Sequence, residues 1–368
     1  MKKENIGVIG IGKLGLSLAL NFEKIGYKVW GCDIRQSYVK SLESKKYSTI
    51  EPSIDELLAS SECFFPTTSL KETVENCNIL YITVRTETEP DGSYDVSQAE
   101  NVVESLLSLG FQNTPKTLII NCNVNPGYTN SVHERLAAYN YKTSFNPEWV
   151  AQGTIVINQT NPDVVVIGEY DAEEGEKILS LYSHLCKNKP AIYRMDCLSA
   201  EITKVSLNCF LTTKITFANM VGDIANKVGA DSKKILEAIG SDSRIGGKYF
   251  SYGYGYGGPC FPRDNRAMIK YAQDNKIEPL LPIATQSYNS KHLEYQVEFD
   301  KSKFAHDEKV YIDGVSYKPG VDILEESQQL LYAKTLADEG YSVVIRDLPS
   351  VCSQVRKLYG DLFELEYK

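Results

Sequence analysis

Hydrophobic and polar positions follow two different periods along the first 190 residues. Leu14, Leu18 and Phe22 recur at every fourth position, which predicts a helix that ends near Gly26. The intervening apolar runs are short and typical of buried strands; they lie at 6–9, 29–34, 79–84, 118–122 and 164–168. Strands separated by helical stretches predict an α/β fold with an N-terminal, Rossmann-like, doubly wound parallel sheet.

From about Ser199 the pattern of hydrophobic positions predicts helices only. Residues 199–228 form one long stretch of helical period without proline, and further helical patterns occupy 233–240 and 264–294. Long helices that expose an apolar face often form subunit contacts. We therefore expect a central helical dimerisation region and a homodimer.

Strand and helix patterns return in the last 60 or so residues. A strand is expected at 309–314, a helix at about 327–339 and a second strand at 342–346. This pattern predicts a smaller C-terminal α/β domain. The expected domains are 1–197 for a dinucleotide, 198–300 for the helices, and 301–368 for the small α/β domain.

Composition narrows the function classes. The 368 residues carry a formal net charge of −9, which argues against a nucleic-acid partner. The nine cysteines have no regular spacing and the four histidines are scattered, so we expect reduced thiols, a cytoplasmic location and no metal site. The sequence has neither a long apolar leader pattern nor an apolar run of about 18 residues, so no membrane association is expected.

A glycine-rich loop follows the first predicted strand. In Gly10-Ile-Gly-Lys-Leu-Gly15, Gly10 permits a tight turn, Gly12 lets the backbone approach a pyrophosphate, and Gly15 allows close packing of helix on strand. Asp33 ends the second strand, where an acid binds ribose hydroxyls and disfavours a 2′-phosphate. NAD is therefore the predicted cofactor. Its predicted binding residues are Gly10, Ile11, Gly12, Lys13, Leu14, Gly15, Asp33 and Arg35.

Two alternatives remain open at this loop. A glycine-rich turn can exist without a ligand, and Arg35, two residues after Asp33, leaves NADP as an alternative cofactor. The motif also does not separate dehydrogenases from other proteins that bind dinucleotides.

A second glycine-rich loop surrounds one cysteine. Residues 253–264 contain four glycines, two prolines and Cys260, which precedes a predicted helix and has Arg263 close by. Both neighbours favour the thiolate form of a cysteine. We expect the loop to serve a ligand rather than packing. The alternative is a buried inert thiol, which is our interpretation of the other eight cysteines.

A dinucleotide site and a reactive cysteine together suggest one chemistry. Hydride transfer from an alcohol gives an aldehyde, which a thiolate captures as a thiohemiacetal. A second hydride transfer gives a thioester, and water releases the acid.

Several further segments resemble the UDP-glucose/GDP-mannose dehydrogenase family, in order and over nearly the whole chain. Besides the two glycine loops, they are 51–58 (EPSIDELL), 146–153 (NPEWVAQG), 200–215 (AEITKVSLNCFLTTKI), 242–246 (DSRIG) and 314–319 (GVSYKP) with Asp322, Glu326 and Ser327. The resemblance implies NAD-dependent oxidation of a nucleotide-sugar substrate at its C6 hydroxyl, of the UDP-glucose 6-dehydrogenase type. It makes the C-terminal domain a nucleotide-sugar-binding domain.

The resemblance also implies roles for individual residues. Cys260 would be the nucleophile, and Lys204 with Asn208, one helical turn apart, would stabilise the developing oxyanion. Asp264 would assist protonation or water activation, and Glu148 would lie near the reacting sugar carbon. The expected substrate-binding residues are Glu148, Lys204, Asn208, Tyr249, Tyr252, Gly257, Gly258 and Lys318. Lys204 and Asn208 could instead be solvated helix residues, and Lys318 a surface charge.

Three positions depart from the family pattern. Asn123 stands where a threonine is usual, and Gln152 replaces a glutamate, so it cannot act as a general base. Glu325 replaces an arginine and reverses a charge. We still expect activity, with Glu148, Asp264 or an ordered water replacing the missing base.

Two other functions remain open. One is a homologue that binds NAD or a nucleotide sugar without turnover. The other is a two-electron hydroxyacid dehydrogenase, which has no need of a cysteine loop.

Overall fold

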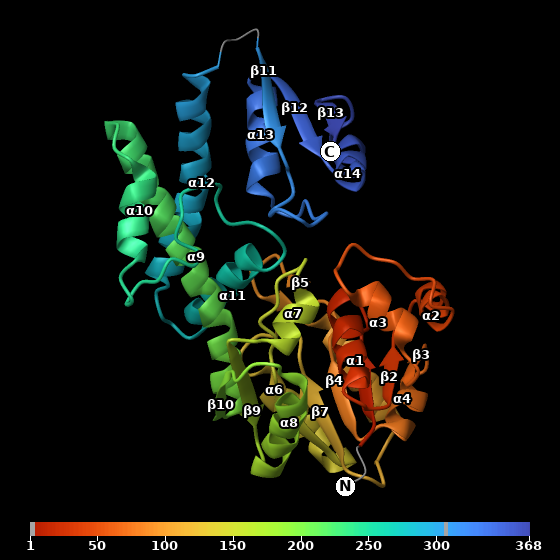
Figure 1. The fold of residues 1–368 in the computed structure, drawn as a ribbon. Helices are drawn as coiled ribbons and strands as arrows, with labels where there is room; N and C mark the ends of the chain where they lie inside the picture. Colours follow the sequence, from red (N-terminus) through yellow and green to blue (C-terminus); the bar gives the residue numbers. More distant parts are fainter. Residues whose placement is uncertain (1–3, 305–307) are drawn as a thin grey trace. The chain divides into compact units, whose positions relative to one another are not determined.

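The structure, a computed structural model, describes residues 4–304 and 308–368 (Figure 1). The chain divides into two compact units, residues 1–204 and residues 205–368. Helix α9 (Cys197–Val228) contains the point of division. The three-domain division predicted from the sequence, with boundaries after residues 197 and 300, stays a prediction.

An eight-stranded sheet forms the centre of the first unit. Its spatial order is β10-β9-β8-β7-β4-β1-β2-β3 (Figure 1). The strands are β1 (Ile6–Ile9), β2 (Val29–Cys32), β3 (Phe64–Thr67), β4 (Ile79–Ile82), β7 (Lys116–Ile120), β8 (Tyr141–Phe145), β9 (Val164–Glu169) and β10 (Ala191–Met195). The predicted α/β class and Rossmann-like sheet are confirmed. The five expected strands end within two residues of the observed bounds, whereas β3, β8 and β10 were not predicted.

One part of the prediction is wrong, because the sheet is not parallel throughout. β9 pairs antiparallel with β8, and β10 runs parallel to β9, so the last two strands oppose the other six. A parallel crossover generally needs a helix that passes over the sheet. The segment between β8 and β9 contains only the six-residue helix α7 (Ile155–Thr160), so the chain turns back instead.

Helices cover both faces of this sheet and create two apolar cores. Ile6 and Val8 of β1 face a core that α1 shares with α3 and α8, and Ile9 faces a core that α5 and α6 share. The helices are α1 (Lys13–Lys24), α2 (Gln36–Glu43), α3 (Ile54–Ser60), α4 (Leu70–Asn76), α5 (Ser97–Ser108), α6 (Tyr128–Leu136) and α8 (Ala172–Leu185). A short 3₁₀ helix, η1 (Ala137–Tyr139), and a small hairpin, β5 (Glu87–Thr88) with β6 (Tyr94–Asp95), complete the unit.

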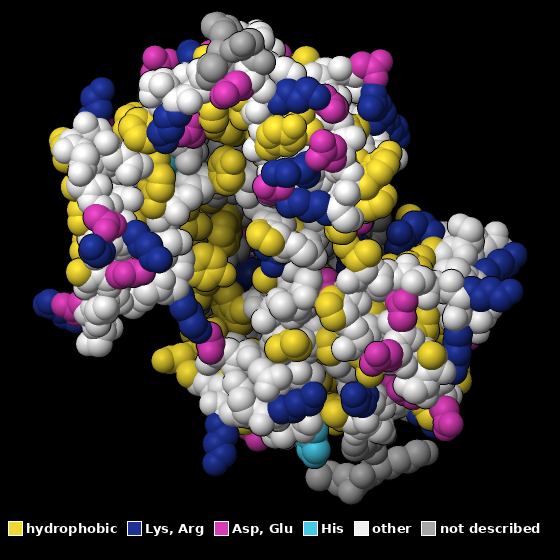
Figure 2. Space-filling model, turned by 45° about the horizontal axis from the view of Figure 1, so that its top comes forward, with side chains coloured by type: hydrophobic (Ala, Val, Ile, Leu, Met, Phe, Trp, Pro, Cys, Tyr) yellow, Lys and Arg dark blue, Asp and Glu magenta, His cyan; other side chains and the backbone are white. Residues whose placement is uncertain are grey.

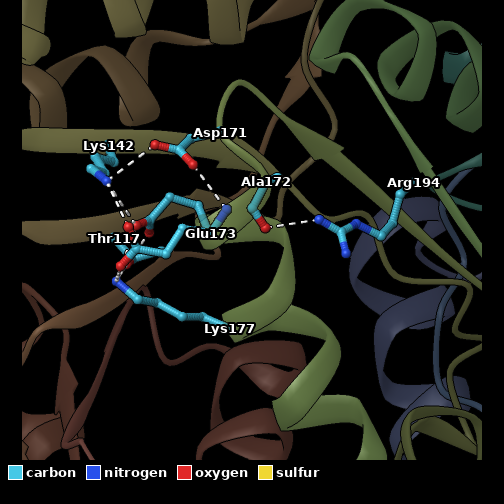
Figure 3. Close-up of polar contacts among 8 residues, drawn as sticks. Thr117, Lys142, Asp171, Ala172, Glu173, Lys177 and Arg194 are labelled. Carbon is cyan, nitrogen blue, oxygen red and sulfur yellow. Dashed lines mark hydrogen bonds and ion pairs between the residues drawn. The ribbon is translucent and has the colours of Figure 1, made fainter.

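A polar cluster attaches the start of α8 to the sheet (Figure 3). Glu174, 1% exposed, accepts a hydrogen bond from the Thr117 hydroxyl and pairs with Lys177 at 3.0 Å, while Lys142 contacts Asp171 at 3.2 Å. Thr117 and Lys142 lie near the beginnings of β7 and β8. The cluster therefore occupies the sheet edge opposite to the Gly10 loop, which follows the end of the parallel strand β1.

The second unit begins with helices. Beyond α9 these are α10 (Ser232–Gly240), α11 (Phe261–Asp274) and α12 (Leu280–Lys301). The helical pattern expected over 264–294 thus comprises two helices, α11 and α12. The break has a local cause: Lys276 adopts a left-handed conformation with φ of 59°, and Pro279, at the N-cap of α12, lacks a backbone N–H.

A smaller α/β arrangement follows in the second unit, as predicted, and its three strands form a parallel sheet. Its order is β11 (Lys309–Asp313), β12 (Ser342–Asp347) and β13 (Glu364–Tyr367), and α13 (Gln328–Asp338) and α14 (Pro349–Tyr359) connect the strands. Its apolar core includes Val310, Ile345 and Val355.

On the face shown in Figure 2, Lys and Arg side chains are interspersed with Asp and Glu. Within the described residues, no helix is both long and apolar enough to cross a membrane. The same residues contain no group of three or more His, Cys, Asp or Glu side chains that could hold a metal ion.

Candidate functional site

The Gly10 loop has the geometry of a dinucleotide cradle. Gly10 has a φ of 92°, which strongly favours glycine, and a Cβ at Gly15 would lie 2.3 Å from the Gly10 carbonyl oxygen. A Cβ at Gly12 would meet nothing within 4 Å, so the backbone there faces open space at the N-cap of α1. A pyrophosphate fits this place, since the first N–H groups of a helix are oriented to receive an anion. The Ile11 side chain is buried, so only its backbone can face a ligand.

Asp33 lies directly after β2, as expected for an acid that binds ribose. It is 7% exposed, and Arg35 folds back on it with Nε and NH2 each 2.8 Å from a carboxylate oxygen. The Arg35 guanidinium also stacks 4.2 Å from the Tyr38 ring centroid. In this arrangement the Arg35 guanidinium pairs with Asp33, while the arginine side chain stays 55% exposed.

Glu148 follows β8 at the same sheet edge as the Gly10 loop. Lys204 donates from Nζ to the Glu148 backbone carbonyl at 2.7 Å and lies 4.5 Å from the Trp149 ring centroid. Burial raises the pKa of the Glu148 carboxyl to about 7, against opposing effects of a hydrogen bond from Gln159 and the charge of Lys204. A carboxyl group with this pKa can exchange a proton near neutral pH.

Gln159 was not among the residues singled out from the sequence. It is 4% exposed and connects α1 to the Glu148 carboxylate. A signal was present: Ser17 and Asn21, its partners on α1, are polar residues one turn apart in an otherwise apolar stretch.

Cys260 is the N-cap residue of α11, in agreement with the predicted helix start. It is the exposed one of the nine cysteines, all of which lie in described residues. Burial instead raises the pKa of several other thiols, to about 12 for Cys77, Cys197 and Cys209 and about 11 for Cys32 and Cys186. Those thiols stay protonated at neutral pH.

Asp264 holds the first turn of α11 beneath Cys260. Its backbone N–H donates to the Cys260 carbonyl at 2.8 Å, and its carboxylate is 0% exposed. The Asn208 amide donates to one carboxylate oxygen at 2.5 Å and Arg263 Nε lies 3.1 Å from the other. The structure thus brings Asn208, Asp264 and Cys260 together within the second unit.

The glycines of the cysteine loop have packing reasons, contrary to expectation. A Cβ at Gly257 would lie 2.2 Å from the Glu326 carbonyl oxygen, and one at Gly258, where φ is 80°, would lie 2.4 Å from the Tyr317 ring. At Gly255 it would lie 2.4 Å from the Asn289 amide oxygen. Close approach of other protein segments therefore requires glycine at these positions, whatever ligand the loop also contacts.

The remaining expected substrate residues have varied surroundings. Tyr249 is 48% exposed with a φ of 60°, whereas the Tyr252 hydroxyl donates to buried Asp223 at 3.1 Å. Lys318 lies half-buried in the turn after β11, and Glu325 is exposed beside Glu326. Their roles toward a substrate stay predictions.

Two glutamates in the segments 51–58 and 200–215, which resemble the family's motifs, act as helix caps. Glu201, 1% exposed, accepts from the Gly127 and Thr129 backbone N–H groups at 2.6 and 2.9 Å, at the start of α6. Glu51 accepts from Gly153 and Ile155 at 2.6 and 2.7 Å, at the start of α7. These carboxylates fix the loops that carry the departures, Asn123 and Gln152, both of which are partly exposed.

Known proteins share this combination of sequence and fold. Residues 4–186 match the NAD-binding domain of the UDP-glucose/GDP-mannose dehydrogenase family, and residues 198–291 match its central domain. The chain belongs to this family. It is an NAD-binding member of the nucleotide-sugar dehydrogenases, and the expected cofactor is confirmed.

Individual relatives cover most of the chain. A UDP-glucose 6-dehydrogenase of Pseudomonas aeruginosa is 30% identical over 92% of this chain and 78% of its own length. A GDP-mannose 6-dehydrogenase of Pseudomonas savastanoi is 28% identical over 93% and 80%. The structure of a UDP-glucose dehydrogenase from Pyrobaculum islandicum superimposes with a TM-score of 0.89 at 29% identity, over 98% of this chain and 85% of that one.

Proposed function

We propose that this family member oxidises the C6 hydroxyl of a nucleotide sugar to a carboxylate in two steps, through a thiohemiacetal and a thioester on Cys260. The single observation that carries the proposal is the position of Cys260. It is an exposed thiol at the N-terminus of a 14-residue helix, in a chain with an NAD-binding domain. A helix N-terminus favours the thiolate, which is the form that attacks an aldehyde.

NAD, when bound, supplies the hydride acceptor for each of the two oxidations. In the first oxidation a base takes the proton of the C6 hydroxyl while a hydride leaves the C6 carbon, and the product is an aldehyde. The Cys260 thiolate then forms a bond to the aldehyde carbon, and Lys204 and Asn208 stabilise the oxygen that becomes negative. Loss of the second hydride gives the thioester, and water releases the carboxylate and regenerates the thiol.

We assign the proton transfers to Glu148. The pKa of about 7, raised by burial, supports this role, since a general base works best when its pKa lies near the working pH. Gln152 has no carboxylate to offer. Asp264, enclosed by Asn208 and Arg263, serves in this proposal to hold the turn that presents Cys260.

Our choice of substrate rests on the family resemblance alone. UDP-glucose is our first candidate, and GDP-mannose is the second, because relatives at similar identity carry both names. Gly257, Gly258, Tyr249, Tyr252 and Lys318 are the residues that we propose for its binding.

We also propose that the protein is a homodimer. Phe210, Phe217 and Ile224 on α9 recur every seven residues and are 66%, 47% and 59% exposed. An apolar stripe of this spacing is typical of a helix that packs against another helix.

NAD reduction with a panel of UDP- and GDP-hexoses tests the proposal. We expect two NADH for each sugar oxidised and no free aldehyde. One NADH per sugar, with aldehyde released, would support the two-electron alternative, and tight binding without NADH formation would support a non-catalytic homologue.

A further inference from the structure

A buried hydrogen-bond network joins the dinucleotide-binding helix α1 to Glu148 through one side chain, that of Gln159 on α7. Gln159 Oε1 accepts from the Ser17 hydroxyl at 2.7 Å and from the Asn21 amide at 2.8 Å. Gln159 Nε2 lies 3.0 and 2.9 Å from the two carboxylate oxygens of Glu148. All four residues belong to the first unit.

The partners determine the direction of the Gln159 amide. An ionised Glu148 only accepts hydrogen bonds, so the Gln159 nitrogen must face it, and the Gln159 oxygen then faces the donors of Ser17 and Asn21. A flipped amide would place nitrogen against nitrogen and oxygen against the carboxylate. The network therefore has one favourable arrangement, in which Glu148 receives N–H donors.

Two buried residues of α1 hold one side of the network in place. Ser17 and Asn21 are 0% and 2% exposed, and they lie one turn apart on the helix that starts at the Gly10 loop. Buried polar groups on an apolar helix face destabilise the fold unless they are hydrogen-bonded. Gln159 satisfies both groups, so its side chain is held from one side by α1 while it holds Glu148 on the other.

We propose that Gln159 is a positioning residue that fixes the Glu148 carboxylate relative to the dinucleotide-binding helix and stabilises its ionised form. This inference rests on the proposed catalytic role of Glu148. In a buried setting an ionised carboxylate needs donors, because without them the neutral acid is favoured. The Gln159 N–H groups supply donors without adding a charge that would hold the carboxylate permanently ionised.

Other titratable groups near Glu148 belong to three elements: Lys204 on α9, Tyr182 on α8 and Tyr81 on β4. The charge of Lys204 acts in the same direction as Gln159 and favours the ionised acid. Burial raises the pKa of both tyrosines far above the usual value, so neither changes charge near neutral pH. A pH effect of changing Gln159 therefore reports on Glu148.

Replacement of Gln159 by Leu tests the proposal directly. The Glu148 carboxyl is titrated by infrared difference spectroscopy of the full chain, with Glu148→Gln to assign the band. We expect the titration midpoint to rise by about one pH unit in Gln159→Leu, since a charge-assisted hydrogen bond is lost. At pH 7 the rate of NAD reduction should fall about fivefold and recover at higher pH, because less of the base is ionised.

Gln112→Leu is the matched control. The Gln112 amide also donates a hydrogen bond, in this case to the backbone carbonyl of Gly110 at 2.9 Å, and this bond lies outside the Glu148 network. Ser17→Ala removes only one donor to Gln159, so the titration midpoint of Glu148 should shift in the same direction by a smaller amount. If Gln159→Leu fails to fold, the Ser17→Ala result decides whether Gln159 positions Glu148.

The outcomes separate this inference from the proposed function. A Glu148 midpoint in Gln159→Leu and Ser17→Ala equal to that of Gln112→Leu overturns the positioning role. A shifted midpoint without any change in the pH profile of NAD reduction keeps the positioning role and overturns the assignment of Glu148 as the base.

Discussion

Two carboxylates that the sequence had grouped as candidate proton-transfer groups are held in opposite ways. Glu148, in the first unit, faces the uncharged amide of Gln159, and burial raises its pKa to about 7. Asp264, in the second unit, is fully buried between the Asn208 amide and the Arg263 guanidinium. A carboxyl group whose pKa lies near 7 exchanges protons readily at neutral pH, whereas one enclosed by an amide and a guanidinium holds these neighbours in place by hydrogen bonds.

In the proposed function, this difference gives each carboxylate its own task. Glu148 is suited to take and return protons, and Asp264 is suited to hold the helix start that carries Cys260. Substitutions that remove charge at the two positions should therefore affect different quantities, activity in one case and stability in the other.

Loss of the thiol should have the largest effect, because both carboxylates serve its chemistry. We expect Cys260→Ser to lower the rate of acid formation by about 10,000-fold, as is typical when a nucleophile is removed. Cys63→Ser, at a half-buried thiol in the first unit, is the control and should leave the rate unchanged. If Cys260→Ser forms the acid as fast as Cys63→Ser does, the thioester route is excluded.

Glu148→Gln should come next. Its shape is preserved but its proton transfer is lost, so we expect acid formation to fall by about 100- to 1,000-fold. Thermal unfolding should remain at or above that of the unmodified protein, since no buried charge is created. If Glu148→Gln were active but less stable, Glu148 would serve stability rather than proton transfer, contrary to the comparison with Asp264.

Asp264→Asn should instead destabilise the fold. Removal of the carboxylate leaves Arg263, 14% exposed, beside a neutral amide, and we expect the free energy of unfolding to fall by about 3 kcal/mol. Urea unfolding of this variant and of Glu148→Gln measures the contrast. Equal stability of the two variants would contradict a holding role for Asp264.

Part of the fold and of the candidate site could be predicted from the sequence, and part could not. The strand and helix periods of the first unit, the glycine loop and the segment around Cys260 gave the α/β fold, NAD and the cysteine at a helix start. The reversed β9 and β10 could not be foreseen, because an apolar run has the same period in either direction.

The sequence shows Ser17 and Asn21 as polar residues in an apolar helix, but it does not show which side chain they contact. Gln159 lies 11 positions from Glu148 and more than 130 from Ser17 and Asn21, so its hydrogen bonds arise only when α1 and α7 pack together. The glycines at 255, 257 and 258 were assigned to a ligand because the protein segments that approach them are distant in the sequence.

A further prediction concerns the pH dependence of stability. Because burial raises the pKa of Glu148 from 4.5 to about 7, the folded chain retains a proton that the unfolded chain has lost within this window. The free energy of unfolding should therefore fall as pH rises from 4.5 to 7, by up to about 3 kcal/mol relative to Glu148→Gln. Urea unfolding of both proteins across this range measures the difference, and parallel curves would mean that Glu148 titrates as an ordinary acid.

The central claim, that a thioester forms on Cys260, is tested most directly by mass spectrometry of the unmodified protein, quenched in acid during a single turnover with NAD and a nucleotide sugar. Acid quenching stops hydrolysis, so the thioester present at that moment should be retained. The account predicts an adduct on the peptide that contains Cys260, with the mass of the substrate less four hydrogen atoms. Consumption of substrate with release of aldehyde and an unmodified Cys260 would contradict it.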